Sequence, residues 1–162
     1  MAQIIPEGWQ TLEVTGAAQR EIETLALLAQ RLPGAYTVYH GVHWTRVNQG
    51  HALVGEIDFA IVNPAGNLLL IEQKSGYLAE TPEGLAKRYN KQEKLVSVQM
   101  TRSTEALRKR LNAHSEADKP QIDSLLYCPD YQVKHPGSAG IDPARIVDAG
   151  RREHLVHTIR SL

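Results

Sequence analysis

Two carboxylates and one amine, those of Asp58, Glu72 and Lys74, are spaced so that a β-hairpin would bring them to one face. Carboxylates directly opposite each other on paired strands have Cβ atoms about 4.5–5.5 Å apart, and their like charges are destabilising unless something positive lies between them. Magnesium binds oxygen ligands and commonly takes one or two carboxylates together with a substrate phosphate. A lysine two residues after the second carboxylate points the same way and could stabilise charge that builds on phosphorus. The pattern therefore predicts a metal-assisted phosphate chemistry.

The hairpin itself is predicted from two strand-like segments, Val54–Val62 and Asn67–Lys74. The loop between them, Pro64-Ala65-Gly66, has proline first and glycine last, which suits a type I turn whose last residue is left-handed. Pairing Asn63 with Asn67 places Asp58 opposite Glu72 and Glu56 opposite Lys74. Alternation puts these side chains on one face and a core pattern on the other. The predicted core residues are Ile57, Phe59, Ile61, Leu69 and Ile71.

A plainer interpretation stays open beside the metal site. Glu56 and Lys74 could form an ordinary cross-strand ion pair, while Asp58 and Glu72 face water. That interpretation explains each residue separately. It does not explain why the charges gather on one face, at the same ends of two otherwise apolar strands, so we favour the functional interpretation of the cluster.

The surrounding elements follow from hydrophobic periodicity and turn residues. Thr15 is the expected N-cap of the first helix, and Pro33-Gly34 is expected to end it. Breaks are expected at Asn48-Gln49-Gly50, at Gly76 and at Thr81-Pro82-Glu83-Gly84. The predicted helices are Ala17–Leu32, Lys91–Asn112 and Glu153–Leu162, and the further strands are Tyr36–Arg46, Ile122–Cys128 and Arg145–Val147. This order predicts an α+β or mixed α/β sandwich.

Composition excludes several classes of protein. The formal net charge is zero, so the whole molecule has no field that would attract nucleic acid or a membrane. The single cysteine, Cys128, excludes an intrachain disulfide and a multi-cysteine zinc site, and we expect it to be buried and inert. No apolar run approaches a membrane span and no signal peptide is evident, so we expect a cytoplasmic protein. We expect residues 1–162 to form a single domain, the N-terminal part of a longer DNA-processing protein that continues past Leu162.

The residues around the hairpin resemble the signature of the PD-(D/E)xK nuclease superfamily and, more narrowly, the NERD (nuclease-related) domain. The resemblance extends over about Gly16 to Cys128. It is carried by Gly55-Glu56-Ile57-Asp58-Phe59, by Asn63-Pro64-Ala65-Gly66 and by Ile71-Glu72-Gln73-Lys74-Ser75-Gly76. It implies a restriction-endonuclease-like central mixed β-sheet flanked by helices, one or two Mg²⁺ or Mn²⁺ ions, and hydrolysis of DNA phosphodiester bonds.

The resemblance also implies a role for individual residues. Asp58 and Glu72 would be metal ligands together with the backbone carbonyl of Gln73, and Lys74 would be the catalytic lysine. A glutamate on the first helix would join the ligands; Glu21 borders the apolar stripe, whereas Glu23 points farther away, so we choose Glu21. Gln99 fits the glutamine that related nucleases carry on the helix after this strand. The segment Ser75-Gly76-Tyr77-Leu78 matches the family pattern only partly.

A basic segment follows the hairpin. Residues 87–112 contain eight Lys or Arg and two Glu, which gives 8 − 2 = +6. Such a segment beside a metal site could hold the DNA backbone, although a charge run alone is usually a solvated surface. The candidate DNA-binding residues are Lys87, Arg88, Lys91, Lys94 and Arg102.

Three hypotheses follow. The first is a Mg²⁺- or Mn²⁺-dependent deoxyribonuclease in DNA processing or repair. The second is a catalytically silent nuclease fold that binds DNA or docks a helicase, a partner that NERD domains often accompany; no ATP-binding motif is present in this chain itself. The third is an interaction domain with no nucleic-acid role. The seven histidines offer no convincing metal set.

Overall fold

The centre of the molecule is a six-stranded mixed sheet. The structure is a computed structural model that describes residues 1–48, 51–114 and 119–162. The strands lie in the order β1-β2-β3-β4-β8-β9, with β2, β3 and β4 antiparallel and the pairs β1–β2, β4–β8 and β8–β9 parallel. Their bounds are β1 Gln3–Ile5, β2 Thr37–Asn48, β3 His51–Val62, β4 Leu68–Gln73, β8 Ile122–Cys128 and β9 Ile146–Asp148.

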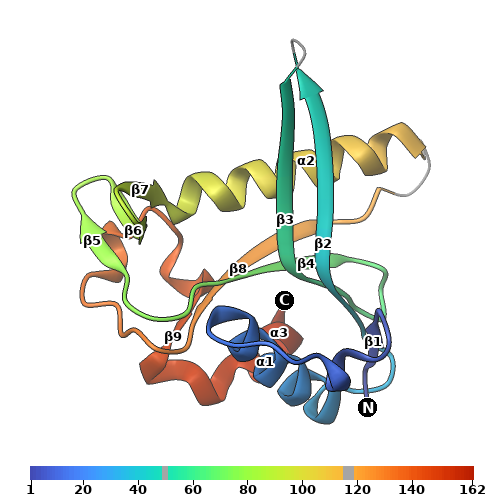
Figure 1. The fold of residues 1–162 in the computed structure, drawn as a ribbon. Coiled ribbons are helices and arrows are strands. Elements are labelled where there is room, and N and C mark those ends of the chain that lie inside the picture. Colours follow the sequence, from blue (N-terminus) through green and yellow to red (C-terminus); the bar gives the residue numbers. More distant parts are fainter. Residues whose placement is uncertain (49–50, 115–118) are drawn as a thin grey trace.

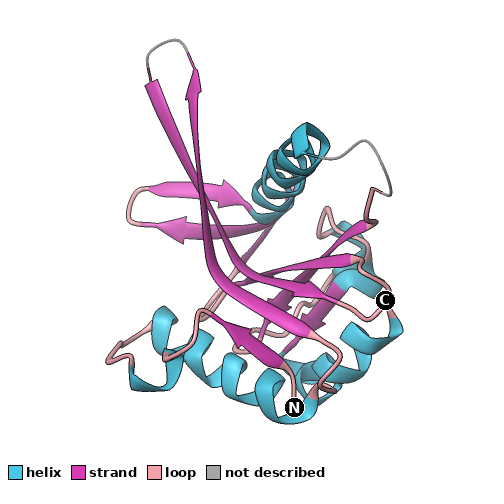
Figure 2. Cartoon of the chain, turned by 90° about the vertical axis from the view of Figure 1, so that its right-hand side faces the viewer, coloured by secondary structure: helices cyan, strands magenta, loops and turns pink. Residues whose placement is uncertain are grey.

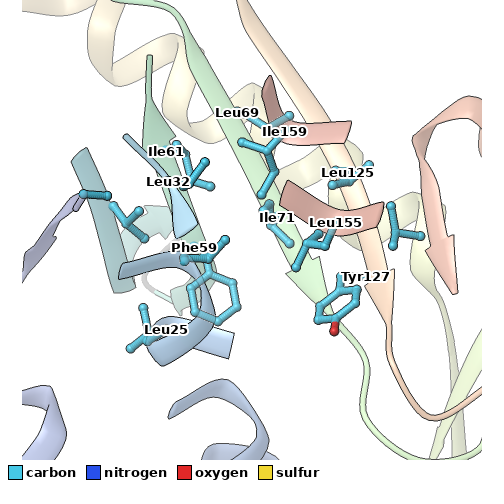
Figure 3. Close-up of a cluster of buried hydrophobic side chains, with 14 of the residues drawn as sticks. Leu25, Leu32, Phe59, Ile61, Leu69, Ile71, Leu125, Tyr127, Leu155 and Ile159 are labelled. Carbon is cyan, nitrogen blue, oxygen red and sulfur yellow. The ribbon is translucent and has the colours of Figure 1, made fainter. Parts of the chain in front are cut away.

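Helices cover both faces of this sheet (Figure 1). Helices α1 (Ala17–Arg31) and α3 (Leu155–Ser161) cover one face, where Leu25, Leu28 and Ile159 pack against the sheet. Alternate residues of β3 and β4 meet them there, as the close-up of this core shows (Figure 3). The predicted core residues Phe59, Ile61, Leu69 and Ile71 all belong to it. The mixed α/β fold with a central mixed sheet flanked by helices is therefore confirmed.

The second face carries helix α2 (Val96–His114) and a small three-stranded sheet. The small sheet consists of β5 (Ala79–Thr81), β6 (Gly84–Tyr89) and β7 (Gln92–Leu95). Leu85 of β6 and Met100 of α2 are buried with Leu126 of β8, while Leu107, farther along α2, packs under Leu70. These contacts hold the small sheet next to the C-terminal end of β4. Within the described residues, no helix has both the length and the apolarity of a membrane span.

The largest correction concerns residues 79–95. We predicted a loop at Thr81-Pro82-Glu83-Gly84 and a helix from Lys91, but the chain forms two antiparallel hairpins and α2 begins only at Val96. Tyr89 pairs with Gln92 across a turn in which Asn90 has a φ of 54°. Asparagine tolerates this left-handed conformation better than most residues. The cross-strand pairing overrides the helix propensity of the Lys, Gln and Glu residues that follow.

Smaller differences concern the ends of elements. Gly16, with a φ of 64°, occupies the N-cap position of α1, and Thr15 does not. Strands β2 and β3 are longer than predicted, and β1 was not predicted at all. The closing segment is a 3-10 helix, Ala149–His154, followed by the short α3. The predicted break at Asn48-Gln49-Gly50 lies mostly outside the described residues.

Strands β2 and β3 form a long arm that projects beyond the rest of the molecule (Figures 1 and 2). The register of the two strands places Gly41 opposite Asp58, but these two residues are not paired. The residues on both sides of them are paired. Gly41 has a φ of 59°, which favours glycine and bends the strand. Val42 and Ile57 therefore pack with Leu70 on the α2 side, whereas Val38 and Phe59 pack on the α1 side. The predicted position of Ile57 beside Phe59 is thus wrong, because the irregularity changes the face.

Gly84 offers a direct test of how the small sheet is anchored. A Cβ at this position would lie 2.6 Å from the carbonyl oxygen of Ala139, and the φ of +127° disfavours any L side chain. We expect Gly84→Ala to lower the free energy of unfolding by about 2 kcal/mol, or roughly 4–8 °C in melting temperature. Gly137→Ala is the matched control, because its Cβ would meet nothing within 4 Å. Equal melting temperatures for the two variants would contradict this anchoring.

Candidate active site

The candidate site lies where β3 and β4 separate. The ladder between them runs from Val62–Leu68 to Phe59–Ile71, in the register predicted from the Pro64-Ala65-Gly66 loop. Gly66 has the expected left-handed φ of 81°. One step beyond the last pair, Asp58 Oδ2 accepts a hydrogen bond of 2.8 Å from the backbone N–H of Gln73. The carboxylate of Asp58 thus bonds to the backbone of β4 at the point where the strand ladder stops.

Lys74 and Glu72 form a close ion pair on the other side of this gap. The distance from Lys74 Nζ to Glu72 Oε1 is 2.7 Å, and the Lys74 residue is only 8% exposed. The backbone N–H of Lys74 donates to the Tyr127 carbonyl of β8 at 2.9 Å, which fixes the base of the side chain. The predicted pairing of Glu56 with Lys74 is therefore wrong, because the strands have already diverged and β4 continues along β8.

Tyr89 is a site residue that the sequence analysis missed. Its hydroxyl accepts a hydrogen bond of 3.1 Å from Lys74 Nζ, and its ring centroid lies 5.8 Å from the same nitrogen. Tyr89 is on β6, so the small sheet contributes directly to the site. The only signal in the sequence was the turn at Asn90, which would have ended a strand at Tyr89 and turned the chain back toward the hairpin.

These contacts keep Lys74 charged. Burial disfavours the ammonium, but Glu72 and Tyr89 outweigh it and raise the pKa of Lys74 above its ordinary value. The side chain is therefore a fixed cation at neutral pH. Such a group is suited to stabilise developing negative charge and is unsuited to accept a proton.

The surroundings of Asp58 and Glu21, in contrast, disfavour the charged forms of these two side chains. Burial, followed by the negative charges of Glu72 and Glu21, raises the pKa of Asp58 to about 8. Burial together with Glu56 and Glu72 raises the pKa of Glu21 to about 7. Crowded carboxylates of this kind are relieved by a cation, and their oxygen donors suit Mg²⁺ or Mn²⁺. The residues present therefore fit the metal that the resemblance implies.

The structure separates the two candidate glutamates of α1. Glu21 is half-buried and is close enough to Asp58 to influence its pKa. Glu23 is exposed and pairs with Arg20 on the helix surface, with 3.1 Å between their nitrogen and oxygen. Of the two, only Glu21 lies where it could complete a ligand set.

Gln73 and Gln99 each have a buried polar side-chain atom. The Gln73 side chain lies against α1, where its Oε1 and the Thr24 hydroxyl are 2.7 Å apart. This contact ties α1, and with it Glu21, to the end of β4. Among the described residues, Gln99 Oε1 is buried without a hydrogen-bond partner. Gln99 lies in the first turns of α2, and among the described residues no hydrogen bond joins its side chain to Lys74.

No three His, Cys, Asp or Glu side chains within the described part of the chain are already arranged as a metal cage. The candidate ligands are instead two carboxylates with a third nearby and the Gln73 backbone carbonyl. Cys128 is buried, and burial raises the pKa of its thiol to about 12, in agreement with the inert thiol that we expected.

The helix that we predicted from Lys91 begins only at Val96, so Lys91 and Lys94 do not lie on it. Lys87 and Arg88 are on β6, Lys91 is in the following turn and Lys94 is on β7, whereas Arg102 is on α2. Arg88, Lys91, Lys94 and Arg102 are exposed. Lys87 has a structural contact: its Nζ donates to the carbonyls of Ser75 at 2.5 Å and Tyr77 at 3.2 Å. The basic side chains therefore gather mainly on a hairpin whose Tyr89 touches Lys74.

Comparison with known proteins agrees with this geometry. The model of the nuclease-related domain family (NERD) matches residues 16–129, which include α1, the hairpin and the strand β8. Searches of the curated proteins and of the solved structures give no match. The matched region covers most of the chain and contains Asp58, Glu72 and Lys74. The chain therefore belongs to the nuclease-related domain family.

Proposed function

We propose that this domain is a Mg²⁺- or Mn²⁺-dependent deoxyribonuclease that hydrolyses phosphodiester bonds in DNA processing or repair. The observation that carries the proposal is the cluster at the end of β4. A buried lysine, held as a cation, lies beside carboxylates whose pKa values are raised by one another and by burial. Perturbed groups of opposite kinds gathered in one place are typical of catalytic sites.

Asp58, Glu72, the Gln73 carbonyl and Glu21 would hold the metal. When bound, the metal supplies positive charge and Lewis-acid polarisation of a phosphate. Lys74 would donate a hydrogen bond to a phosphate oxygen as negative charge builds there. Glu72 and Tyr89 orient the Lys74 ammonium, so Lys74 remains positioned by Tyr89 if Glu72 turns to the metal. Gln99, with its buried oxygen, would help to position a water or the DNA.

The DNA backbone would lie along the β6–β7 hairpin. Arg88, Lys91 and Lys94 are exposed there, and Arg102 follows on α2. Contacts of this kind carry no sequence information, and they weaken steeply as the salt concentration rises, because binding releases counterions from the DNA. A helicase or another DNA-processing domain, in this or another chain, remains the partner that we propose.

The proposal is tested by incubating the purified protein with single- and double-stranded DNA in the presence of Mg²⁺ or Mn²⁺. We expect cleavage that Asp58→Ala lowers roughly 100-fold or more, because it removes a ligand and the acceptor of the Gln73 N–H. Glu21→Ala should lower cleavage as well. Glu23→Ala is the matched control on the same helix and should retain it, since Glu23 points away from the cluster.

Each outcome of this experiment has a meaning. Cleavage that persists in Asp58→Ala would show a contaminant or a different site. Salt-dependent DNA binding without cleavage, unaffected by divalent metal and by Asp58, would assign the chain to the silent DNA-binding alternative. The exposed basic hairpin makes that alternative physically reasonable.

A further inference from the structure

The loop that follows Lys74 presents an aromatic ring to solvent. Tyr77 is 72% exposed, more than any other aromatic residue whose side chain the structure describes. It lies three residues after Lys74, so the two Cα atoms are no more than about 11 Å apart even in an extended chain. A large exposed aromatic side chain is thus placed beside the candidate active site.

The loop is held firmly although the ring is not buried. The rings of Tyr131 and Tyr77 form a T-shaped pair, with centroids 5.3 Å apart and an interplanar angle of 77°. The Tyr131 hydroxyl in turn donates to Glu80 at 2.6 Å. Lys87 bonds the Tyr77 carbonyl, and Asp130 accepts the N–H of Gly76 at 2.9 Å. Lys87 of β6 and the segment Asp130–Tyr131 therefore hold the loop of a ring that gains little burial in return.

We propose that Tyr77 is a stacking platform for an unpaired base, so that the DNA on which this site acts is single-stranded or locally unpaired next to the scissile phosphate. The inference rests on the proposed function and names its substrate class. An aromatic face binds any base, because every base has a π face. In a duplex both faces of a base are covered by its neighbours, so an unpaired base is the ligand that such a platform selects.

The charges nearby suit the same ligand. Proteins that bind single strands combine aromatic platforms with a basic groove that follows the backbone. Exposed Arg88, Lys91 and Lys94 lie on the hairpin that also carries Tyr89, and the Lys94 Nζ is 5.5 Å from the centroid of the Tyr89 ring. Because Tyr89 contacts Lys74, a strand held by this hairpin would pass the lysine, with Tyr77 within reach of a neighbouring base.

Binding without metal tests the inference independently of cleavage. The probe is a short DNA oligonucleotide that contains one 2-aminopurine, a base whose fluorescence is quenched on stacking, offered as a single strand and as a duplex in EDTA. We expect tighter binding of the single strand, with quenching. Tyr77→Ala and Tyr77→Leu should weaken single-strand binding roughly tenfold and abolish the quenching. Tyr77→Phe should keep both, and duplex binding should not change.

Leu12→Ala is the control, because Leu12 is another exposed apolar side chain, at 50%, outside this loop. The melting temperature of each variant shows whether it is folded. The inference is overturned if Tyr77→Leu binds the single strand as the wild type does, or loses single-strand and duplex affinity equally. If the wild type cleaves DNA and the Tyr77 variants bind it unchanged, the stacking platform is ruled out and the nuclease proposal stands. If binding depends on Tyr77 but no cleavage is seen, the nuclease proposal fails and the platform stands.

Discussion

Replacing Lys74 by methionine should lower the rate of DNA cleavage by roughly 10²–10³-fold while leaving the chain folded. Methionine keeps an unbranched apolar stem that matches the lysine stem as far as its last carbon, and it removes the charge. The stem is buried, whereas the ammonium bonds to Glu72 and Tyr89. Loss of the cation should therefore appear chiefly in kcat, since the phosphate would need it most in the transition state.

Lys119→Met is the matched control for this variant. Lys119 is an exposed lysine that precedes β8, at the opposite end of that strand from the Tyr127 carbonyl that bonds Lys74. Steady-state cleavage of a labelled DNA strand with Mg²⁺ measures kcat and KM for both variants. If Lys74→Met cleaves at the wild-type rate and melts normally, the lysine has no catalytic role and the site must be sought elsewhere.

The register of the β3–β4 hairpin was predictable because local chemistry determines it. The Pro64-Ala65-Gly66 loop determines the register of β3 and β4, and the register brings Asp58 to the end of β4. The strand β8 was predicted with its observed bounds, because an apolar run between a proline and a polar loop leaves few alternatives. Short-range signals sufficed for both elements.

The contacts of Lys74 were not predictable in the same way. The ladder stops at Phe59–Ile71, near the irregularity at Gly41 of β2, a residue that is distant from Glu72 in sequence. Tyr89 reaches Lys74 only because residues 84–95 pair as a hairpin and pack under α2. We predicted a helix from Lys91, over the last part of that segment, and tertiary packing overrode this propensity.

The titration of Asp58 and Glu21 should make the metal-free protein less stable at pH 8 than near pH 5. Their pKa values are raised in the folded state, to about 8 and about 7, from the ordinary values of 3.8 and 4.5. Between roughly pH 4 and pH 8 the folded state therefore binds more protons than the unfolded chain, and stability falls as the pH rises through this window. Above pH 8 both carboxylates are charged and their full repulsion opposes folding.

Asp58→Asn isolates this effect from the other titrating groups. Asparagine still offers an oxygen to the Gln73 N–H but carries no charge at any pH. We expect the variant to be more stable than the metal-free wild type by about 2 kcal/mol at pH 8, or about 4–8 °C in melting temperature, and the difference to shrink toward pH 5.

Divalent metal should reverse the order of the melting temperatures of the wild type and Asp58→Asn. A cation bound at the carboxylates stabilises the wild type by mass action at pH 8, and Mg²⁺ or Mn²⁺ should raise its melting temperature much more than that of Asp58→Asn. Glu105→Gln, a change of an exposed glutamate on α2, controls for general charge effects and should behave like the wild type. A metal-free Asp58→Asn that melts below the wild type at pH 8 would mean that the Asp58 carboxylate stabilises the fold, so that this site is an ordinary polar contact with no need of a cation.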